Sequence, residues 1–182
     1  LRKVKEAVDV PVIGSLNGTT QAGWLDYARL IEQAGADALE LNVYTVGSDP
    51  SEDCSTIEKR LVDMVAAVAG KTTLPIAVKL SPSYTGLSHL ARQLSAAGAK
   101  GLVLFNRFYA PDIDLGSLTV QPALTLSESD DLRLPLRWLG ILRSQLPGTS
   151  LAATSGVHTG ADVLKALPIG RTKQLSAAFP AA

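Results

Sequence analysis

The strongest constraint on the fold is an alternation of short apolar runs with longer segments of helical periodicity. The apolar runs cover residues 10–16, 37–41, 75–80, 101–105 and 150–153. The segments near 21–34, 56–69, 86–97, 135–146 and 160–167 place apolar residues three or four positions apart. Nearly continuous apolar strands separated by amphipathic helices are typical of parallel strands covered by helices. The alternation therefore predicts an α/β protein with about five β/α units.

The ends of two predicted helices support this division into units. Ala34-Gly35-Ala36-Asp37 and Ala97-Gly98-Ala99-Lys100 each place a glycine just after a helix, and a strand follows at once. Glycine is the residue that most easily takes the left-handed backbone conformation with which helices commonly end. No linker separates the units, so residues 1–182 are expected to form a single incomplete domain.

Polar residues gather at the carboxyl end of each predicted strand. They are Ser15, Asn17, Glu40, Asn42, Lys79, Asn106, Thr154 and Ser155. Five units fit either an open doubly wound sheet or part of a closed barrel, and barrel enzymes assemble their sites from the carboxyl ends of several strands. Any one of these residues could simply end a strand, but together they favour a partial (β/α)8 barrel. The length of 182 residues falls short of the roughly 250 of a complete barrel.

One long connection, residues 107–130, interrupts the regular alternation. Connections of this length are usually functional or carry their own structure. The alternating stretch at 118–126 predicts a small antiparallel hairpin at the barrel mouth. Pro135 is expected to open the next helix at its first position, where proline is favoured.

Composition excludes several classes of protein. With 17 basic and 17 acidic side chains, the chain lacks the basic surface that nucleic acid requires. No apolar run approaches the roughly 18 residues of a membrane span, and the first ten residues contain no signal-peptide core. A single cysteine, Cys54, fits the reducing cytoplasm. His89 and His158 lie too far apart to suggest metal ligation, so no metal site is expected.

Among single residues, Lys79 is the strongest candidate for a functional role because it interrupts an apolar strand. Its ammonium group must either reach the barrel mouth or be paired inside the protein. Two interpretations remain open at this point. One is a salt bridge to Glu40 on a neighbouring strand. The other is a fixed cation that holds an electron-rich ligand.

The segment from Thr154 to Gly160 joins a strand to a helix through small residues. A helix amino terminus of this kind exposes backbone N–H groups and suits a phosphate. Thr159-Gly160-Ala161-Asp162 also resembles a capping box with aspartate in place of glutamate, so ordinary helix capping is the alternative. Asn42 and Asn106 can both donate and accept hydrogen bonds, as the edge of a heterocyclic ring requires.

Five motifs together resemble one known family. They are Ser15-Leu16-Asn17-Gly18, Glu40-Leu41-Asn42, Val78-Lys79-Leu80-Ser81-Pro82, Leu104-Phe105-Asn106-Arg107 and Thr154-Ser155-Gly156-Val157-His158-Thr159. From about residue 4 to about residue 168, their order resembles the dihydroorotate dehydrogenase family, and most of all its bacterial dihydroorotate dehydrogenase-like branch. The resemblance implies a barrel that binds flavin mononucleotide (FMN). It also implies oxidation of the CH–CH group of dihydroorotate or a related dihydropyrimidine, in pyrimidine biosynthesis, and a possible homodimer of the full-length form.

The resemblance also implies roles for particular residues. Lys79 would act beside the flavin ring, while Asn42 and Asn106 would contact flavin or substrate. Ser155 and Gly156 would hold the flavin phosphate, where the family usually has two glycines. The family's catalytic base falls at Thr45, whose hydroxyl is a poor base at its ordinary pKa.

Other departures from the family suggest a fragment. The family's second strand-end asparagine is Gly47 here, and its first two β/α units are absent before Leu1. After Gly170, where the family continues into a strand, residues 171–182 form an atypical tail that begins Arg171-Thr172-Lys173-Gln174. Two alternatives to a flavin enzyme stay open: a non-catalytic barrel that binds flavin or a phosphate ligand, and an inactive gene fragment.

Overall fold

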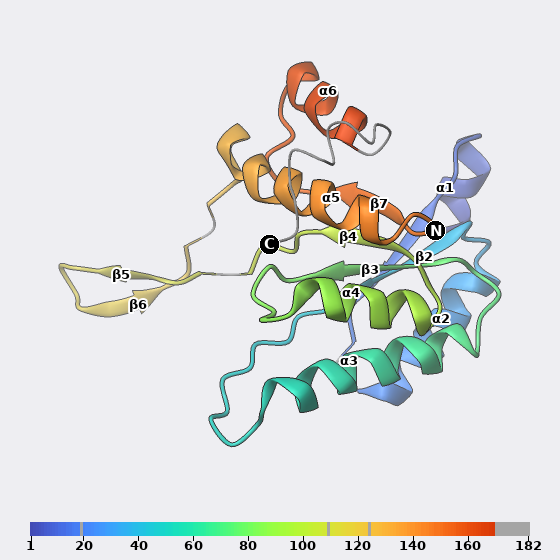
Figure 1. The fold of residues 1–182 in the computed structure, drawn as a ribbon, viewed down its shortest axis with the longest axis horizontal. Coiled ribbons are helices and arrows are strands. Elements are labelled where there is room, and N and C mark those ends of the chain that lie inside the picture. Colours follow the sequence, from blue (N-terminus) through green and yellow to red (C-terminus); the bar gives the residue numbers. More distant parts are fainter. Residues whose placement is uncertain (19, 109, 124, 170–182) are drawn as a thin grey trace.

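A parallel sheet of five strands forms the centre of the protein (Figure 1). The computed structural model describes residues 1–18, 20–108, 110–123 and 125–169; the tail expected at 171–182 lies outside them. The strand order is β1-β2-β3-β4-β7, which is the order along the chain. The strands are β1 (Ile13–Leu16), β2 (Ala38–Asn42), β3 (Ile76–Leu80), β4 (Ala99–Leu104) and β7 (Ser150–Ala153). Each predicted apolar run therefore overlaps a strand, although β2 ends one residue after the run at 37–41 and β4 begins two residues before the run at 101–105.

The helices follow the strands in a regular succession. They are α1 (Arg2–Ala7), α2 (Gln21–Gln33), α3 (Cys54–Ala69), α4 (Leu87–Ala96), α5 (Arg133–Gln145) and α6 (Gly160–Ile169). From α2 to α6, each helix packs against the next one along the chain, so the helices form one continuous layer beside the sheet (Figure 1). The described strands form an open sheet with β1 and β7 at its edges. The architecture is that of a partial barrel, as the sequence predicts.

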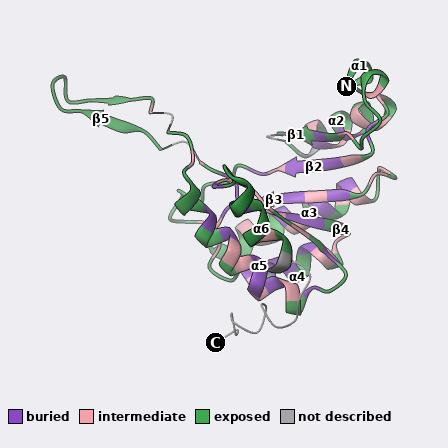
Figure 2. Cartoon of the chain, turned by 90° about the horizontal axis from the view of Figure 1, so that it is seen from above, coloured by how far each residue is buried: buried purple, intermediate pink, exposed green. Residues whose placement is uncertain are grey.

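The two faces of the sheet differ in burial (Figure 2). Leu39, Leu41, Val78 and Leu80 alternate along β2 and β3 and are fully buried in the core. The residues between them, among them Glu40, Asn42 and Lys79, are only partly buried. Successive strand side chains point to opposite faces. The apolar residues therefore face the helices, and the polar residues face the inner side of the partial barrel.

The ends of the helices explain how the units are joined. Asp53 caps α3 by accepting a hydrogen bond from the Thr56 backbone N–H, with an oxygen–nitrogen distance of 2.7 Å. Gly35 and Gly98 have φ angles of +85° and +113°, which confirms the predicted left-handed turns after α2 and α4. Helix α1 was not predicted, because its six residues include no buried one and so show no apolar stripe.

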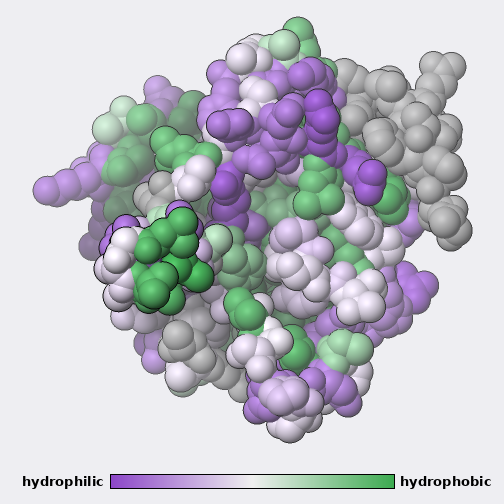
Figure 3. Space-filling view, turned by 90° about the vertical axis from the view of Figure 1, so that its left-hand side faces the viewer, coloured by the Kyte–Doolittle hydropathy of each residue, from purple (hydrophilic) through white to green (hydrophobic). Residues whose placement is uncertain are grey.

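The long connection forms the predicted hairpin. Strands β5 (Asp112–Asp114) and β6 (Thr119–Gln121) pair in antiparallel fashion, and the hairpin extends away from the sheet (Figure 1). It carries exposed apolar side chains and is seen end-on in Figure 3. These side chains are Ile113, Leu115, Leu118 and Val120.

The prediction for Pro135 was wrong. A 3-10 turn, η1 (Ser129–Leu132), comes first, and α5 begins at Arg133, so the proline is its third residue. The first four N–H groups of a helix have no partner within it, so proline is tolerated there as well. Within the described ranges, no helix is long and apolar enough to cross a membrane.

Candidate functional site

Polar side chains from three neighbouring strands meet on the inner face of the sheet. The strand register places Ser15 beside Glu40, and Asn42 beside Lys79. Ser15 Oγ donates a hydrogen bond to Glu40 Oε1 over 3.0 Å. Lys79 Nζ lies 4.0 Å from the same oxygen, and its side chain keeps 22% of its surface exposed. Lys79 therefore pairs with Glu40, the first of its two interpretations, but the pair is loose and the ammonium group remains accessible to a ligand, as the second requires.

Asn106 brings the end of β4 into the same cluster. It is buried, and its Nδ2 donates to Asn42 Oδ1 over 2.6 Å and to the Val43 carbonyl over 3.3 Å. Its backbone N–H donates to the Leu80 carbonyl over 2.7 Å. These bonds hold the two asparagines together across β3. We call Glu40, Asn42, Lys79 and Asn106 the inner-face cluster.

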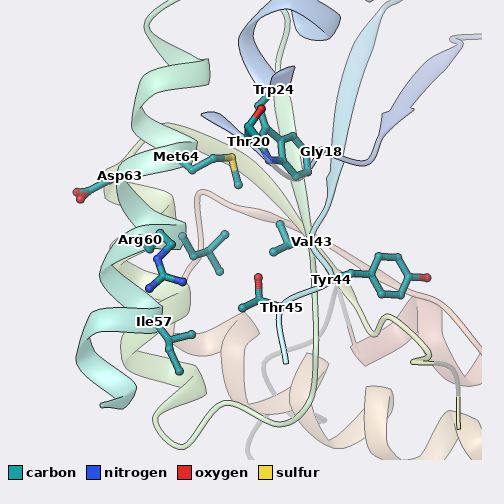
Figure 4. Close-up of a pocket in the computed structure, with 11 residues that line it drawn as sticks. Gly18, Thr20, Trp24, Val43, Tyr44, Thr45, Ile57, Arg60, Asp63 and Met64 are labelled. Carbon is teal, nitrogen blue, oxygen red and sulfur yellow. The ribbon is translucent and has the colours of Figure 1, made fainter. Parts of the chain in front are cut away.

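Thr45 does not join this cluster. It is exposed on the loop after β2, and within the described residues it makes no hydrogen bond to any member of the cluster. Figure 4 shows Thr45 on the same side of its loop as Ile57 and Arg60 of α3, while Tyr44 points the opposite way. Thr45 lies three residues beyond Asn42, so strand alternation also favours the helix side. Tyr44 makes an edge-to-face contact with Phe108, with ring centroids 5.2 Å apart.

Two cavities adjoin Thr45. The one drawn in Figure 4 has a volume of about 410 Å³ and lies against α2 and α3, with Trp24 and Met64 in its wall. The other, of about 590 Å³, lies between the loops that follow β2 and β3. We call this second space the loop cavity. It is lined by Thr45, Val46, Gly47, Glu52, Cys54, Ile57, Glu58, Ser81, Ser83, Tyr84, Thr85 and Phe108.

The loop after β7 is tightly built around Gly156. Gly156 has a φ of +76°, and a Cβ there would lie 2.2 Å from the Leu132 backbone nitrogen, so only glycine fits. Ser155 also adopts the left-handed region, with a φ of +71°. That conformation costs a non-glycine residue roughly 1–2 kcal/mol. Ser155 thus takes a glycine-like backbone at the place where the family resemblance leads one to expect glycine.

The predicted capping box after this loop is confirmed. The Asp162 backbone N–H donates to Thr159 Oγ1 over 3.2 Å, and the Thr159 N–H donates to Asp162 Oδ2 over 3.0 Å. Asp162 is buried and also accepts bonds from the Ser129 hydroxyl and the His158 N–H. The Ser129 and Thr159 hydroxyl bonds are the main reasons why the pKa of Asp162 lies well below its usual range. Since this carboxylate occupies the N–H groups of His158 and Thr159, a phosphate here would need the amides nearer Ser155.

Sequence reasoning missed one ion pair beside the cluster. Arg107 Nη1 lies 2.6 Å from Asp131 Oδ2, and Arg107 Nη2 donates to the Thr125 carbonyl over 3.3 Å. The bond from the Glu128 N–H, and then the Arg107 charge, lower the pKa of Asp131. Arg107 and Asn106 line a small cavity of about 130 Å³ that reaches Ser155. The only signal in the sequence was that Arg107 directly follows Asn106.

The described residues form no group that could bind a metal ion. In the part of the chain that the structure describes, no three His, Cys, Asp or Glu side chains are grouped so as to hold a metal ion. Cys54 is free and exposed.

Comparisons with known proteins find dihydroorotate and dihydropyrimidine dehydrogenase subunits that are similar to this chain in sequence. It is 31% identical to the catalytic subunit of dihydroorotate dehydrogenase B (NAD(+)) of Geobacillus kaustophilus, over 88% of the chain and 52% of that protein. It is 26% identical to the NAD-dependent dihydropyrimidine dehydrogenase subunit PreA of Escherichia coli K12, over 93% of the chain and 45% of that protein. The chain thus spans about half the length of these relatives. No protein-family model matches it.

Solved structures support the partial-barrel fold. A crystal structure of a mandelate oxidase variant superimposes with a TM-score of 0.58 at 21% identity, covering 93% of this chain and 50% of the oxidase. YagE, an Escherichia coli K12 protein of the dihydrodipicolinic acid synthase family, gives a TM-score of 0.55 at 18% identity, covering 91% of this chain and 48% of YagE. At these identities the likeness concerns the fold alone.

Proposed function

We propose that the chain belongs to a flavin-dependent oxidoreductase, because it is similar in sequence to the catalytic subunit of dihydroorotate dehydrogenase B (NAD(+)). The relatives act, by their names, on dihydroorotate and on dihydropyrimidines. The proposed reaction is oxidation of the CH–CH bond of dihydroorotate or a related dihydropyrimidine, with FMN as cofactor. The observation that carries the proposal is the inner-face cluster, which joins a lysine and two asparagines at the carboxyl ends of three adjacent strands.

The residues of the cluster fit a flavin ring. A flavin presents carbonyl oxygens and ring nitrogens along one edge, which need both donors and acceptors. Lys79 supplies a charged donor, and the asparagine amides supply both kinds of group. Asn106 is fixed by bonds to Asn42 and to the backbone, so its amide is already oriented before a ligand binds. We propose that Ser155 and Gly156 hold the flavin phosphate with their backbone amides.

The chain's own residues would act as follows. A flavin held by the inner-face cluster would supply the redox chemistry, that of a hydride acceptor. Lys79 holds a positive charge where negative charge develops, and such a fixed charge stabilises more in a site sheltered from water than in solution. Thr45 is the proton acceptor that the family resemblance implies. As the substrate CH–CH bond becomes a double bond, one hydrogen leaves as the hydride and the other as the proton.

The position of Thr45 favours a second candidate function. Its side chain faces α3 rather than the inner-face cluster (Figure 4). This geometry suits a barrel that binds flavin or a phosphate ligand without removing a proton from a substrate. Flavin binding without flavin reduction by dihydropyrimidines would identify this second function.

Titration of the purified chain with FMN, followed by flavin fluorescence, tests the proposal. We expect weak but saturable binding, because the open sheet contacts the ring from one side. Lys79→Met should weaken that binding by about threefold or more, the scale of one lost charged hydrogen bond. Lys100→Met is the matched control, because Lys100 is exposed near the amino end of β4. Absence of saturable binding, or equal losses in the two variants, would contradict the proposal.

A further inference from the structure

The charge of the loop cavity restricts the substrate that it can accept. The cavity has a volume of about 590 Å³, within the range of roughly 300–1,000 Å³ usual for small-molecule sites. Thr45 and Gly47 from the loop after β2 face Ser81 and Ser83 from the loop after β3. Thr45, the proposed proton acceptor, is thus one of the residues that line it.

Two carboxylates line this cavity, and no basic side chain does so among the described residues. Glu52 is paired with Arg60, which stands outside the loop cavity. Glu58 is half-buried and has no ion-pair partner in the described part of the chain. The Glu58 charge adds to burial in raising the pKa of the Tyr84 hydroxyl. The wall thus carries an uncompensated negative charge.

The described cations nearest these strand ends lie outside the loop cavity, and each is within 4.0 Å of a carboxylate. Lys79 has Glu40 at 4.0 Å, and Arg107 has Asp131 at 2.6 Å. Arg60 has Glu52. Among the described residues, the lining of the loop cavity therefore offers no cation to a substrate carboxylate. An anion entering the loop cavity would meet a like charge with no compensation, which is how a site discriminates against a ligand.

We infer that the site takes an uncharged dihydropyrimidine ring rather than the carboxylated dihydroorotate. This inference rests on the proposed function and narrows its substrate class. The hydroxyl groups of Thr45, Ser81 and Ser83 suit the ring amide and carbonyl groups. Phe108 offers an apolar ring face beside them, held by its edge contact with Tyr44. Nothing in this lining requires a charge on the ligand.

The test compares the affinities of two ligands that share the same dihydropyrimidine ring but differ in charge. The whole chain is titrated with 5,6-dihydrouracil and with dihydroorotate at neutral pH, and binding is followed by NMR chemical shifts. We expect dihydrouracil to bind about tenfold more tightly than dihydroorotate. This ratio corresponds to the repulsion between the Glu58 carboxylate and the ligand carboxylate when no nearby cation offsets it. Glu58→Gln should reduce this preference to about threefold or less, and high salt should reduce it in the same direction. Asp130→Asn is the control, because its exposed carboxylate lies on η1 and pairs with Arg133.

Each outcome decides the inference. Tighter binding of dihydroorotate, or a preference that Glu58→Gln leaves unchanged, would overturn it while leaving FMN binding intact. Glu58→Lys should invert the preference, and failure of a folded Glu58→Lys variant to do so would also count against it. Absence of binding by either ring up to on the order of 10 mM would overturn the inference as well. The FMN titration of the same preparation reports on the proposed function separately.

Discussion

The two faces of the parallel sheet are built from the same strands but perform different tasks. On the helix-covered face, Leu41 and Val78 are fully buried, as are their neighbours along the strands. On the inner face, Glu40 and Lys79 keep about a fifth of their side-chain surface exposed, at 20% and 22%. Alternate residues of one strand therefore belong to the buried core and to the proposed ligand-binding face, because the side-chain period of a strand is two.

The inner face shows how polar groups are tolerated on a sheet. Ser15 bonds to Glu40, and Asn106 bonds to Asn42, so side-chain groups find partners across strands. Such bonds contribute only about 0.5–1.5 kcal/mol each, since they replace bonds to water. The apolar face instead removes whole side chains from water, which stabilises by roughly 1.5–3 kcal/mol for each leucine or valine. Stability should therefore depend far more on one face than on the other.

Leu41→Ala should give the largest loss and test this division directly. Leu41 has no exposed surface, and removing a buried leucine side chain costs about 2–5 kcal/mol. The free energy of unfolding is measured by urea denaturation. Glu40→Gln, one residue away on the opposite face, is the control and should cost about 1 kcal/mol or less. Equal losses in the two variants would show that the faces do not differ as proposed.

Asp162→Asn should have a smaller effect, and one that depends on pH. Asp162 is a buried carboxylate that accepts bonds from several donors, whereas Glu40 is half-exposed with few partners. Because the pKa of Asp162 is lower in the folded protein than its ordinary value of 3.8, its contribution to stability is complete above that value. The contribution is lost as pH falls through the lower folded pKa.

The wild-type chain should therefore be more stable than Asp162→Asn from pH 5 to pH 7, by a constant amount. The difference should shrink below about pH 4. Urea midpoints of both proteins across this range provide the measurement. Other carboxyl groups, such as Asp53 and Asp131, also have lowered pKa values and titrate in the same window. Only the difference between the two proteins isolates Asp162, and a difference independent of pH would contradict the assignment.

Periodicity predicted most of the fold because strands and helices repeat over many residues. The apolar runs located the five parallel strands. The alternation at 118–126 indicated a hairpin but covers only its second strand, β6, while β5 at 112–114 lies before it. Helix α1 was not predicted because a helix with no buried residue has no apolar stripe. The start of α5 was placed too late because the turn before it, η1, is polar and has no repeat.

The candidate site was predictable only where strand geometry determines it. Glu40 and Lys79 could be matched because they lie on neighbouring strands and on the same face. Arg107 and Asp131 could not, because 24 residues and a hairpin separate them, and no local pattern reports their contact. The direction of Thr45 agrees with strand alternation counted from Asn42, although no strand is formed at residue 45 itself.

Lys79→Met should have the smallest effect on stability and gives the finest test of the comparison. Its ammonium group lies 4.0 Å from Glu40 Oε1, and both side chains remain partly exposed. Pairs of this kind contribute about 1 kcal/mol or less, whereas breaking a fully buried pair costs about 3–5 kcal/mol. Urea denaturation of Lys79→Met should therefore show a loss near the lower figure, with Lys100→Met as the exposed control. A loss as large as that of Leu41→Ala would make Lys79 part of the scaffold, and the inner face would then serve stability as the outer face does. A small loss of stability combined with weakened FMN binding would show that Lys79 contributes to ligand binding and little to folding.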